Sequence, residues 1–371
     1  MQHLLTLNAG SSSLKFALFE IGGDLSQPIE SGQIEGLGQA GGTITHVQAL
    51  DQVLARIGVR RVAAVGHRIV HGGVALDRPV LIDDAVLAAI GALQPLAPLH
   101  QPHNLAGVRA AQQRFAGVPQ VACFDTAFHR STPELNQRFA LPQHLFDAGI
   151  RRYGFHGLSY ESILAQLHTI DAASAQSRVV VAHLGNGSSM CAMRAGQSVA
   201  TTMSFSPLDG LPMGTRCGRL DAAVVLHLWQ HMGLSADEVS RLLYRESGLL
   251  GLSGESADLR TLQASATPAA AMAIDYLVEH LLRELAAMVA ALRGIDVLVF
   301  TGGIGENAAA VRERVVTGAA WMGLRLDARA NAQANAQHAA CVSAKDSRAV
   351  IRVLHTSEEA VIARHTVQLL G

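Results

Sequence analysis

Short apolar runs recur along the chain, and most of them end in a polar loop. Residues 4–21 read as a strand, a tight Asn/Gly/Ser loop and a second strand, because apolar residues alternate on both sides of the loop. Residues 61–73 and 118–129 each read as a buried strand that runs into a loop. Residues 177–204 repeat the pattern of the first segment. This echo predicts two related halves.

Helical periodicity fills much of the space between these strands. Residues 82–100 read as a helix until prolines stop it, and residues 104–117 as an amphipathic helix. Residues 220–232 and 268–292 are stronger helical patterns. The glycine-rich stretch before about residue 50 instead suggests further strands and turns. Strands alternating with helices predict two α/β domains with polar loops facing a cleft.

Composition narrows the function classes. The chain has 371 residues, which suits two domains, and 49% of them are hydrophobic. A formal net charge of −1 disfavours binding to nucleic acid or to an acidic membrane surface. No apolar run approaches the length of a membrane span. Four scattered cysteines without a C-x-x-C pair disfavour zinc or disulfides and fit a cytoplasmic location.

Three polar loops at strand ends could hold phosphate. Residues 8–13, N-A-G-S-S-S, offer close backbone N–H groups and hydroxyls, and Lys15 follows in a chain that has only two lysines among its 29 basic residues. Residues 183–189 form the matching loop of the second half. Residues 303–307, G-I-G-E-N, lie between a buried strand and a helix. Each loop alone could be a plain turn, and it is the presence of three such loops at strand ends that indicates phosphate binding.

The glycine motifs typical of other nucleotide-binding folds are either out of context or absent. Residues 36–41 match G-x-G-x-x-G, but the segment that follows begins extended, so a dinucleotide site is disfavoured. No G-x-x-x-x-G-K-[ST] sequence occurs, which excludes a P-loop. Neither H-E-x-x-H nor a nucleophile elbow is present.

Charged residues also stand at the ends of buried strands and in turn-rich loops. Arg68 and Asp125 each follow a buried strand, His156 lies between glycines, and Arg216 lies in a tight loop. Any one of them could be a solvated cap. Together, two arginines, an aspartate and a histidine indicate an anionic reaction centre.

The motifs N-A-G-S-S-S-L-K, G-H-R-I-V-H-G-G, F-D-T-A-F-H, R-Y-G-F-H-G, H-L-G-N-G-S-S, M-G-T-R-C-G-R-L-D, F-T-G-G-I-G-E-N and S-E-E-A-V-I-A-R run in this order from residue 8 to 364. Together they resemble the acetate kinase family, which is related to sugar kinases, heat-shock chaperones and actin. The resemblance implies two RNase-H-like (actin-like ATPase) domains around an interdomain nucleotide cleft. The first would comprise residues 1–125 and 360–371, the second 126–359.

The same resemblance implies roles for particular residues. Asn8 and Glu358 would bind Mg²⁺, for which Mn²⁺ can substitute. Asp125 would be the catalytic acid/base, and His156 and Arg216 would stabilise the transition state. Arg68 would hold the carboxylate, with an apolar pocket formed by Val70, Leu99, Phe155 and Pro207. ATP would be bound by Ser11, Ser13, Lys15, His183, Leu184, Gly185, Asn186, Gly187, Asp258, Leu259, Arg260, Gly303, Ile304, Gly305, Glu306 and Asn307.

The sequence departs from the family in three places. Residues 301–307 read T-G-G-I-G-E-N where T-A-G-I-G-E-N is expected, and residues 355–359 read H-T-S-E-E where T-N-E-E is more usual. The chain is also shorter than most relatives between about residues 35 and 60. The shorter segment affects the outer edge of the first domain. The change at residues 355–359 affects the contacts of the magnesium site.

The implied activity is reversible transfer of the ATP γ-phosphoryl group to acetate, by a homodimer. Acetate is already ionised at pH 7, so we hypothesise that Asp125 acts mainly by positioning. A propionate or other short-chain acyl kinase is the nearest alternative. A non-catalytic nucleotide switch of the actin type is the alternative of another class, and a dinucleotide dehydrogenase is a distant third.

Overall fold

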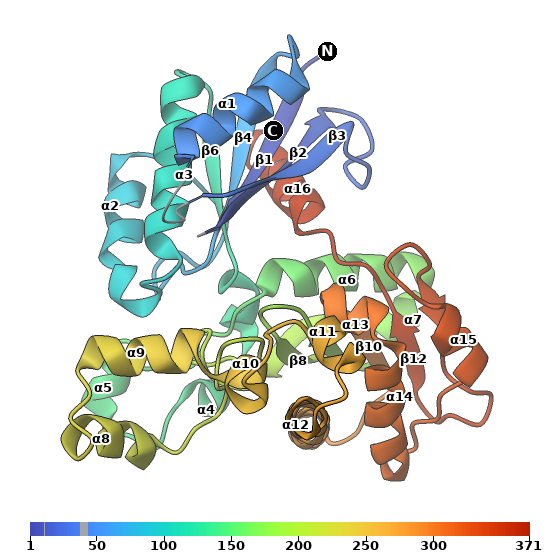
Figure 1. The fold of residues 1–371 in the computed structure, drawn as a ribbon. Helices are drawn as coiled ribbons and strands as arrows, with labels where there is room; N and C mark the ends of the chain where they lie inside the picture. The colour runs from blue at the N-terminus through green and yellow to red at the C-terminus, as the bar shows by residue number, and fades with distance from the viewer. Residues whose placement is uncertain (11, 38–43) are drawn as a thin grey trace. The chain divides into compact units, whose positions relative to one another are not determined.

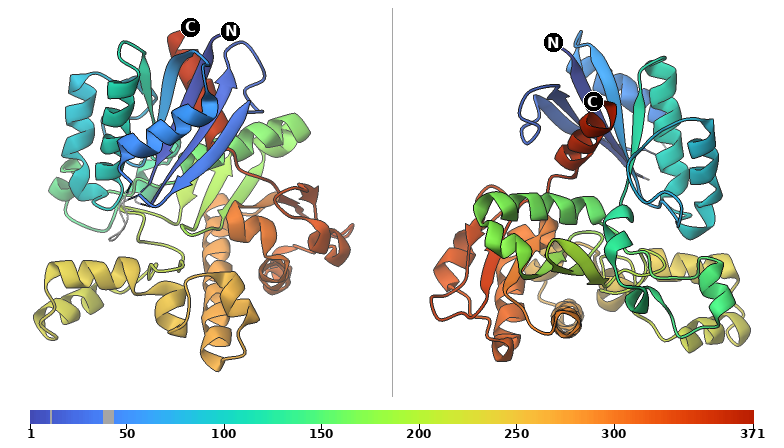
Figure 2. Two further views of the ribbon diagram at one scale, coloured as in Figure 1. Left: turned by 45° about the horizontal axis from the view of Figure 1, so that its top comes forward. Right: turned by 180° about the vertical axis from the view of Figure 1, so that it is seen from behind.

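The computed structural model describes residues 1–10, 12–37 and 44–371, so Ser11 and part of the 36–41 glycine pattern lie outside the described residues. The chain divides into two compact units. Unit 1 is Met1–Arg130, Phe155–Ser162 and Ser357–Gly371, and unit 2 is Ser131–Gly154 and Ile163–Thr356. Each unit is built on one six-stranded mixed sheet, as Figures 1 and 2 show.

The bounds of the units differ from those expected from the sequence, 1–125 with 360–371 and 126–359. Residues 155–162 return to unit 1 because the Gly157 N–H donates to the carbonyl oxygen of Asp125 at 2.9 Å. Leu158 packs with Val121 and Cys123 of the first sheet. The C-terminal helix, together with Ser357 just before it, belongs to unit 1.

The sheet of unit 1 has the strand order β3-β2-β1-β4-β6-β5. Its strands are β1 (His3–Ala9), β2 (Ser13–Glu20), β3 (Glu30–Glu35), β4 (Val62–Ile69), β5 (Val80–Leu81) and β6 (Gln120–Phe124). Helices α1 (His46–Ile57), α2 (Asp84–Ala92) and α3 (Gln101–Arg114) lie on one side of it, and α16 (Glu358–Leu370) packs on the other (Figure 1). Strand β1 serves both faces by alternation, since Leu5 and Leu7 face α1 and α3 while Leu4 faces α16.

The sheet of unit 2 has the order β11-β12-β10-β7-β8-β9. Its strands are β7 (Arg178–His183), β8 (Ser189–Arg194), β9 (Gln197–Thr201), β10 (Val297–Thr301), β11 (Ala340–Cys341) and β12 (Val350–Val353). Read from β9, this order repeats that of unit 1: an antiparallel trio, two further parallel strands and an antiparallel edge strand. The predicted pair of related halves is therefore confirmed.

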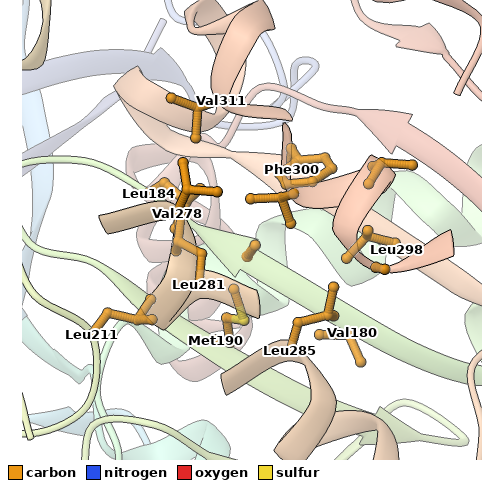
Figure 3. Close-up of a cluster of buried hydrophobic side chains, with 14 of the residues drawn as sticks. Val180, Leu184, Met190, Leu211, Val278, Leu281, Leu285, Leu298, Phe300 and Val311 are labelled. Carbon is orange, nitrogen blue, oxygen red and sulfur yellow. The ribbon is translucent and has the colours of Figure 1, made fainter. Parts of the chain in front are cut away.

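The core of unit 2 lies between its sheet and the long helix α12 (Pro268–Leu292). Figure 3 shows Leu281 and Leu285 of α12 beside Val180, Met190, Leu298 and Phe300 of the sheet. The other helices of the chain are α4 (Glu134–Gln137), α5 (Gln143–Asp147), α6 (Gly157–Ile170), α7 (Ala172–Gln176), α8 (Ala222–Gln230), α9 (Ala236–Arg245), α10 (Gly248–Ser253), α11 (Leu259–Ala264), α13 (Gly302–Asn307), α14 (Ala309–Gly318) and α15 (Ala328–Gln333), with short 3-10 turns at Gln94–Leu96, Ala127–Ser131 and Ala320–Met322. No described helix is long and apolar enough to cross a membrane.

Two local predictions were wrong. The strands and turns expected before about residue 50 include β3, but the chain is helical from His46 onward, because Thr45 and Gln48 form a capping box. The glycine loop expected after β10 is itself the short helix α13. Gly302 has a φ of 77°, and this left-handed residue lets the chain turn directly from the strand into the helix.

Candidate functional site

Unit 1 brings four of the predicted site residues together where β1, β4 and β6 end. Asn8 is near the end of β1, Arg68 is near the end of β4, and Asp125 directly follows β6. Glu358 joins them as the first residue of α16. Carboxyl ends of neighbouring parallel strands meet at one edge of a sheet, which is why residues so distant in sequence converge here.

Arg68 is the centre of this group. Its Nη2 lies 2.6 Å from Asp125 Oδ2 and its Nε 2.9 Å from Asp125 Oδ1, so the two side chains form a bidentate pair. Its Nη1 donates to Asn8 Oδ1 at 3.2 Å, and its Nε lies 3.4 Å from Glu358 Oε2. The Asn8 amide in turn donates to Glu358 Oε2 at 3.4 Å. Four side chains therefore form one connected polar cluster.

The charged side chains of this cluster are largely shielded from solvent, and this burial affects their pKa values. Asp125 is 1% exposed and the Arg68 side chain 19%. Burial raises the pKa of Asp125 to about 6, although the charge and hydrogen bonds of Arg68 act in the opposite direction. Burial acts to lower the pKa of Arg68, but the neighbouring carboxylates Asp125 and Glu358 together outweigh it and raise that pKa, so the guanidinium stays charged.

Lys15 and His156 flank the same cluster. Lys15 is exposed on β2 directly opposite Asn8 in the antiparallel register. His156 has a φ of 60°, which is rare for a residue with a side chain and marks local strain. That strained residue is fixed by Gly157, where an added Cβ would lie only 2.3 Å from the Asp125 carbonyl oxygen. The backbone of Asp125 thus holds His156 in place.

The predicted apolar pocket residues divide between the units. Val70 and Phe155 are buried in unit 1, and Leu99 is half-buried there. Phe155 packs edge-on against His71, with 5.5 Å between the ring centres. Pro207 and Arg216 belong to unit 2, where Arg216 Nη1 donates to the Pro207 carbonyl oxygen at 2.9 Å. The predicted pocket residues therefore belong to two units, Val70, Leu99 and Phe155 to the first and Pro207 to the second.

Unit 2 contains a separate cavity of about 610 Å³. This volume suits a small organic ligand. Most of the predicted nucleotide residues of unit 2 line it, namely Gly185, Asn186, Asp258, Leu259, Arg260, Gly303, Ile304 and Asn307. Gly214, Ala257, Gln263 and Ala308 line it too and were not predicted. Gly214 could have been found from the M-G-T-R motif, but the others carry no sequence signal.

Helix α13 forms one wall of this cavity, and its position is fixed from behind. The N–H groups of Ile304 and Gly305 donate to the Leu184 carbonyl oxygen at 2.8 and 3.1 Å. The fully buried Arg312 donates from Nη1 to the carbonyl oxygens of Gly305 and Glu306, at 2.9 and 2.8 Å. Its other N–H groups donate to Asn331 and Ala334, so all five are used.

Not all of the predicted nucleotide residues line the cavity. His183, Leu184, Gly187, Gly305 and Glu306 are absent from its lining. Glu306 is 3% exposed, accepts from the Gly302 N–H at 2.8 Å and pairs with His355 at 2.9 Å. Its carboxylate thus holds the strand-to-helix turn from inside. Ser13 lies in unit 1 at the start of β2.

Among the described residues, no cluster of three or more His, Cys, Asp or Glu side chains is arranged to hold a metal ion. Mg²⁺ needs no such cluster, because it retains several waters and takes only one or two protein oxygens. The Asn8 Oδ1 atom and the Glu358 carboxylate are two such oxygens in one polar group. The residues present therefore fit Mg²⁺.

Comparison with known proteins agrees with this arrangement. The model of the acetokinase family matches residues 3–364. The acetate kinase of Methylocella silvestris is 50% identical, over 99% of this chain and 98% of that protein, and the acetate kinase of Rhodopseudomonas palustris is 48% identical, with the same shares covered.

Two solved structures of acyl kinases are also similar to this chain. This chain resembles the acetate kinase of Porphyromonas gingivalis with a TM-score of 0.90 at 35% identity, and a propionate kinase of Francisella tularensis with a TM-score of 0.91 at 34% identity. Both comparisons cover 100% of each chain. The predicted α/β fold with two RNase-H-like, actin-like ATPase domains is confirmed.

Proposed function

Because this chain belongs to the acetokinase family, we propose that it is an ATP-dependent acetate kinase that transfers the γ-phosphoryl group of ATP to acetate, giving acetyl phosphate and ADP, and catalyses the reverse reaction. The observation that carries this proposal is the buried polar cluster around Arg68. A guanidinium held between carboxylates and an amide at a strand end is suited to bind a second small anion.

The geometry of Arg68 supports end-on binding of acetate. Of its five N–H groups, Nε, one on Nη1 and one on Nη2 donate to described residues. One N–H on each terminal nitrogen is left for a ligand, and two parallel N–H groups match the two oxygens of a carboxylate. Asp125 holds the guanidinium in the orientation that presents this edge.

Acetate does not need a base, since a simple carboxylic acid is ionised at pH 7. The role we assign to Asp125 is to orient Arg68 and to balance its charge. His156 lies beside it and Arg216 is in unit 2, and both are proposed to donate to the phosphoryl oxygens as their charge shifts in the transition state. The strained backbone of His156 supports a functional role for its ring.

Asn8 and Glu358 are the residues that would hold Mg²⁺, with Mn²⁺ as a substitute. When bound, the ion neutralises phosphate charge. Lys15, opposite Asn8, adds a point charge for the phosphate tail. The cavity of unit 2 would take the adenosine part of ATP, with Arg260 and Asp258 in its lining and Gly303, Ile304 and Asn307 of α13 along one wall.

The preference for acetate over longer acids depends on the residues that line the acyl pocket. Val70, Leu99, Phe155 and Pro207 are the proposed lining, and a relative of similar likeness is a propionate kinase. One methylene in such a pocket is worth about 1–3 kcal/mol. Propionate is therefore expected to react more slowly than acetate, and butyrate more slowly still.

The decisive experiment traps the acyl phosphate with hydroxylamine in the presence of ATP and Mg²⁺. The purified protein should form it from acetate with a higher kcat/KM than from propionate or butyrate. A higher value for propionate would reassign the protein as a propionate kinase. Absence of product with all three acids would favour the alternative of a non-catalytic nucleotide switch.

We also propose a homodimer in the cytoplasm. Helix α8 has no buried residue and exposes Val224, Leu226 and Trp229. Leu226 and Trp229 are three residues apart and so share one face of the helix, and this exposed apolar face is suited to bind a second copy of the chain. Light scattering should show a dimer for the wild type and a monomer for Leu226→Arg/Trp229→Glu. A monomeric wild type would contradict the proposal of a homodimer.

The four free cysteines fit a reducing compartment, which is the observation that supports the proposed cytoplasmic location.

A further inference from the structure

The ends of β1 and β4 are joined by a side chain from a helix. These two strands pair in parallel register as far as Leu7 and His67. Beyond that point the amide of Asn104 connects them: its Nδ2 donates to the Ala9 carbonyl oxygen at 2.8 Å, and its Oδ1 accepts from the Val70 N–H at 2.9 Å. Asn104 is 3% exposed, so this bridge is shielded from water.

The bridge lies directly behind the proposed acceptor site. Ala9 follows Asn8, and Val70 is two residues after Arg68. Asn8 Oδ1 and Arg68 Nη1 are themselves 3.2 Å apart. A change in the spacing of the two strand ends would therefore change the contact between the proposed metal ligand and the proposed carboxylate-binding group.

The first turns of α3 repeat this contact with the strand ends. Gln101, one turn before Asn104, is fully buried and donates to the His71 carbonyl oxygen at 2.8 Å. Gly107, one turn after it, faces β1 so closely that an added Cβ would lie 2.7 Å from the Ala9 Cβ. Residues at i, i+3 and i+6 share a helix face, so one face of α3 sets both strand ends.

The repeated topology offers an internal comparison. Strands β7 and β10 of unit 2 occupy the places of β1 and β4. Their ends are joined by the main chain itself, through the Leu184 N–H and the Thr301 carbonyl oxygen at 2.8 Å. In unit 1, the equivalent connection depends on one side chain, which makes it sensitive to a single substitution.

We infer that Asn104 is a positioning residue for phosphoryl transfer, which sets the separation of Asn8 and Arg68 by bridging the ends of β1 and β4. This inference rests on the proposed function of those two residues. Asn104 touches neither substrate, and it acts only through the backbone of the two strand ends.

The test replaces Asn104 by aspartate, which has the same shape. Asn104→Asp puts an oxygen where the Nδ2 donor faced the Ala9 carbonyl oxygen, so the bridge is lost and the strand ends separate. We expect kcat to fall at least tenfold, and the acetate KM and the Mg²⁺ concentration for half-maximal rate to rise severalfold. The ATP KM should stay within twofold, because the nucleotide cavity is in unit 2.

Thr6→Val is the matched control. Thr6 is fully buried on β1, two residues before Asn8, and its hydroxyl donates to the Ala17 carbonyl oxygen at 3.2 Å. This variant loses a buried hydrogen bond from the same strand but leaves the strand ends bridged. Its kinetic constants should match the wild type. If Asn104→Asp behaves like Thr6→Val, or loses acetate and ATP affinity equally, the inference is overturned.

Gly107→Ala provides a second route in case Asn104→Asp does not fold. Its new Cβ pushes α3 away from Ala9 without changing a polar group. The same selective loss for acetate and Mg²⁺ is expected, and wild-type constants in this variant would overturn the inference. A wild-type protein that forms no acyl phosphate would instead refute the proposed function, so the two failures are distinguishable.

Discussion

Arg68 and Asp125 form a buried bidentate pair, with the two guanidinium nitrogens Nη2 and Nε at 2.6 and 2.9 Å from the two carboxylate oxygens. Removing Arg68 would leave the buried Asp125 carboxylate without its partner, whereas removing Asp125 would leave Arg68 beside Glu358 Oε2 at 3.4 Å. Breaking a buried pair from one side costs about 3–5 kcal/mol. In the proposed function this pair serves both stability and acetate binding, and the two contributions can be separated by mutation.

Arg68→Ala should raise the acetate KM at least tenfold while the ATP KM changes little, because acetate loses the group that binds its carboxylate and ATP loses no contact. The same variant should lower the free energy of unfolding, measured in urea, since Asp125 stays buried and unpaired. Arg68→Ala/Asp125→Asn should regain much of that stability but not the acetate affinity. Equal increases in the two KM values would contradict the role assigned to Arg68.

Arg260→Ala should have the opposite substrate signature. Arg260 lines the cavity of unit 2 and pairs with Asp258 at 2.7 Å on an exposed surface, so its loss should cost little stability. We expect the ATP KM to rise severalfold with the acetate KM unchanged. Arg283→Ala, which removes an exposed arginine paired with Glu279 on α12, is the control and should leave both constants as they are. An unchanged ATP KM in Arg260→Ala would place the nucleotide elsewhere.

Much of the candidate site could be predicted from the sequence, because its polar residues lie where apolar strands end. Asn8, Arg68 and Asp125 each stand at the end of a strand that the alternation of apolar residues reveals, and parallel strands bring such ends together. What could not be predicted depends on contacts made only in the fold. Arg312 is one arginine among many in the sequence, and its burial results from carbonyl groups that converge from two segments, α13 and the end of α15.

The same limit explains the local errors. Gly302–Asn307 reads as a loop because it is rich in glycine, yet it becomes helical when Leu184 accepts two of its N–H groups and Arg312 holds its carbonyl groups. Asn104 reads as an ordinary polar residue at a helix start. Only the spacing of two strands, which the sequence does not contain, makes it a bridge.

Gly66→Ala should destabilise unit 1. Gly66 lies on β4 where α16 crosses it, and an added Cβ would be 2.5 Å from both Ile362 Cγ2 and Thr366 Oγ1. Moving the helix should cost about 1–3 kcal/mol, measured by urea unfolding. Gly91→Ala is the control, because its nearest neighbour is 4.0 Å away and alanine is the better helix former. It should be neutral or stabilising, and equal losses in both variants would refute the packing argument.

Acid should weaken the fold between about pH 6.5 and 4, before most carboxylates titrate. Burial lowers the pKa of His67, His71 and His129 to about 4. In this range the three rings bind protons in the unfolded chain but not in the folded one, which outweighs the opposite effect of Asp125, whose pKa is raised to about 6, so the free energy of unfolding falls as pH falls. Each histidine contributes about 1.4 kcal/mol per pH unit. Urea midpoints at pH 7, 6 and 5 should decline, and less steeply in His67→Gln. A flat profile would mean that these rings are protonated in the folded protein.

The five hydrogen bonds of Arg312 have a consequence for nucleotide binding at the site proposed in unit 2. Because the carbonyl groups at the end of α13 are already restrained by a guanidinium that no ligand touches, this wall of the cavity is ordered before any nucleotide arrives. Association then loses little conformational entropy there, and the affinity that would otherwise be spent on immobilising a glycine-rich turn remains available. Gly303 leaves this wall of the cavity without a side chain, while a buried cation supplies the rigidity that glycine lacks.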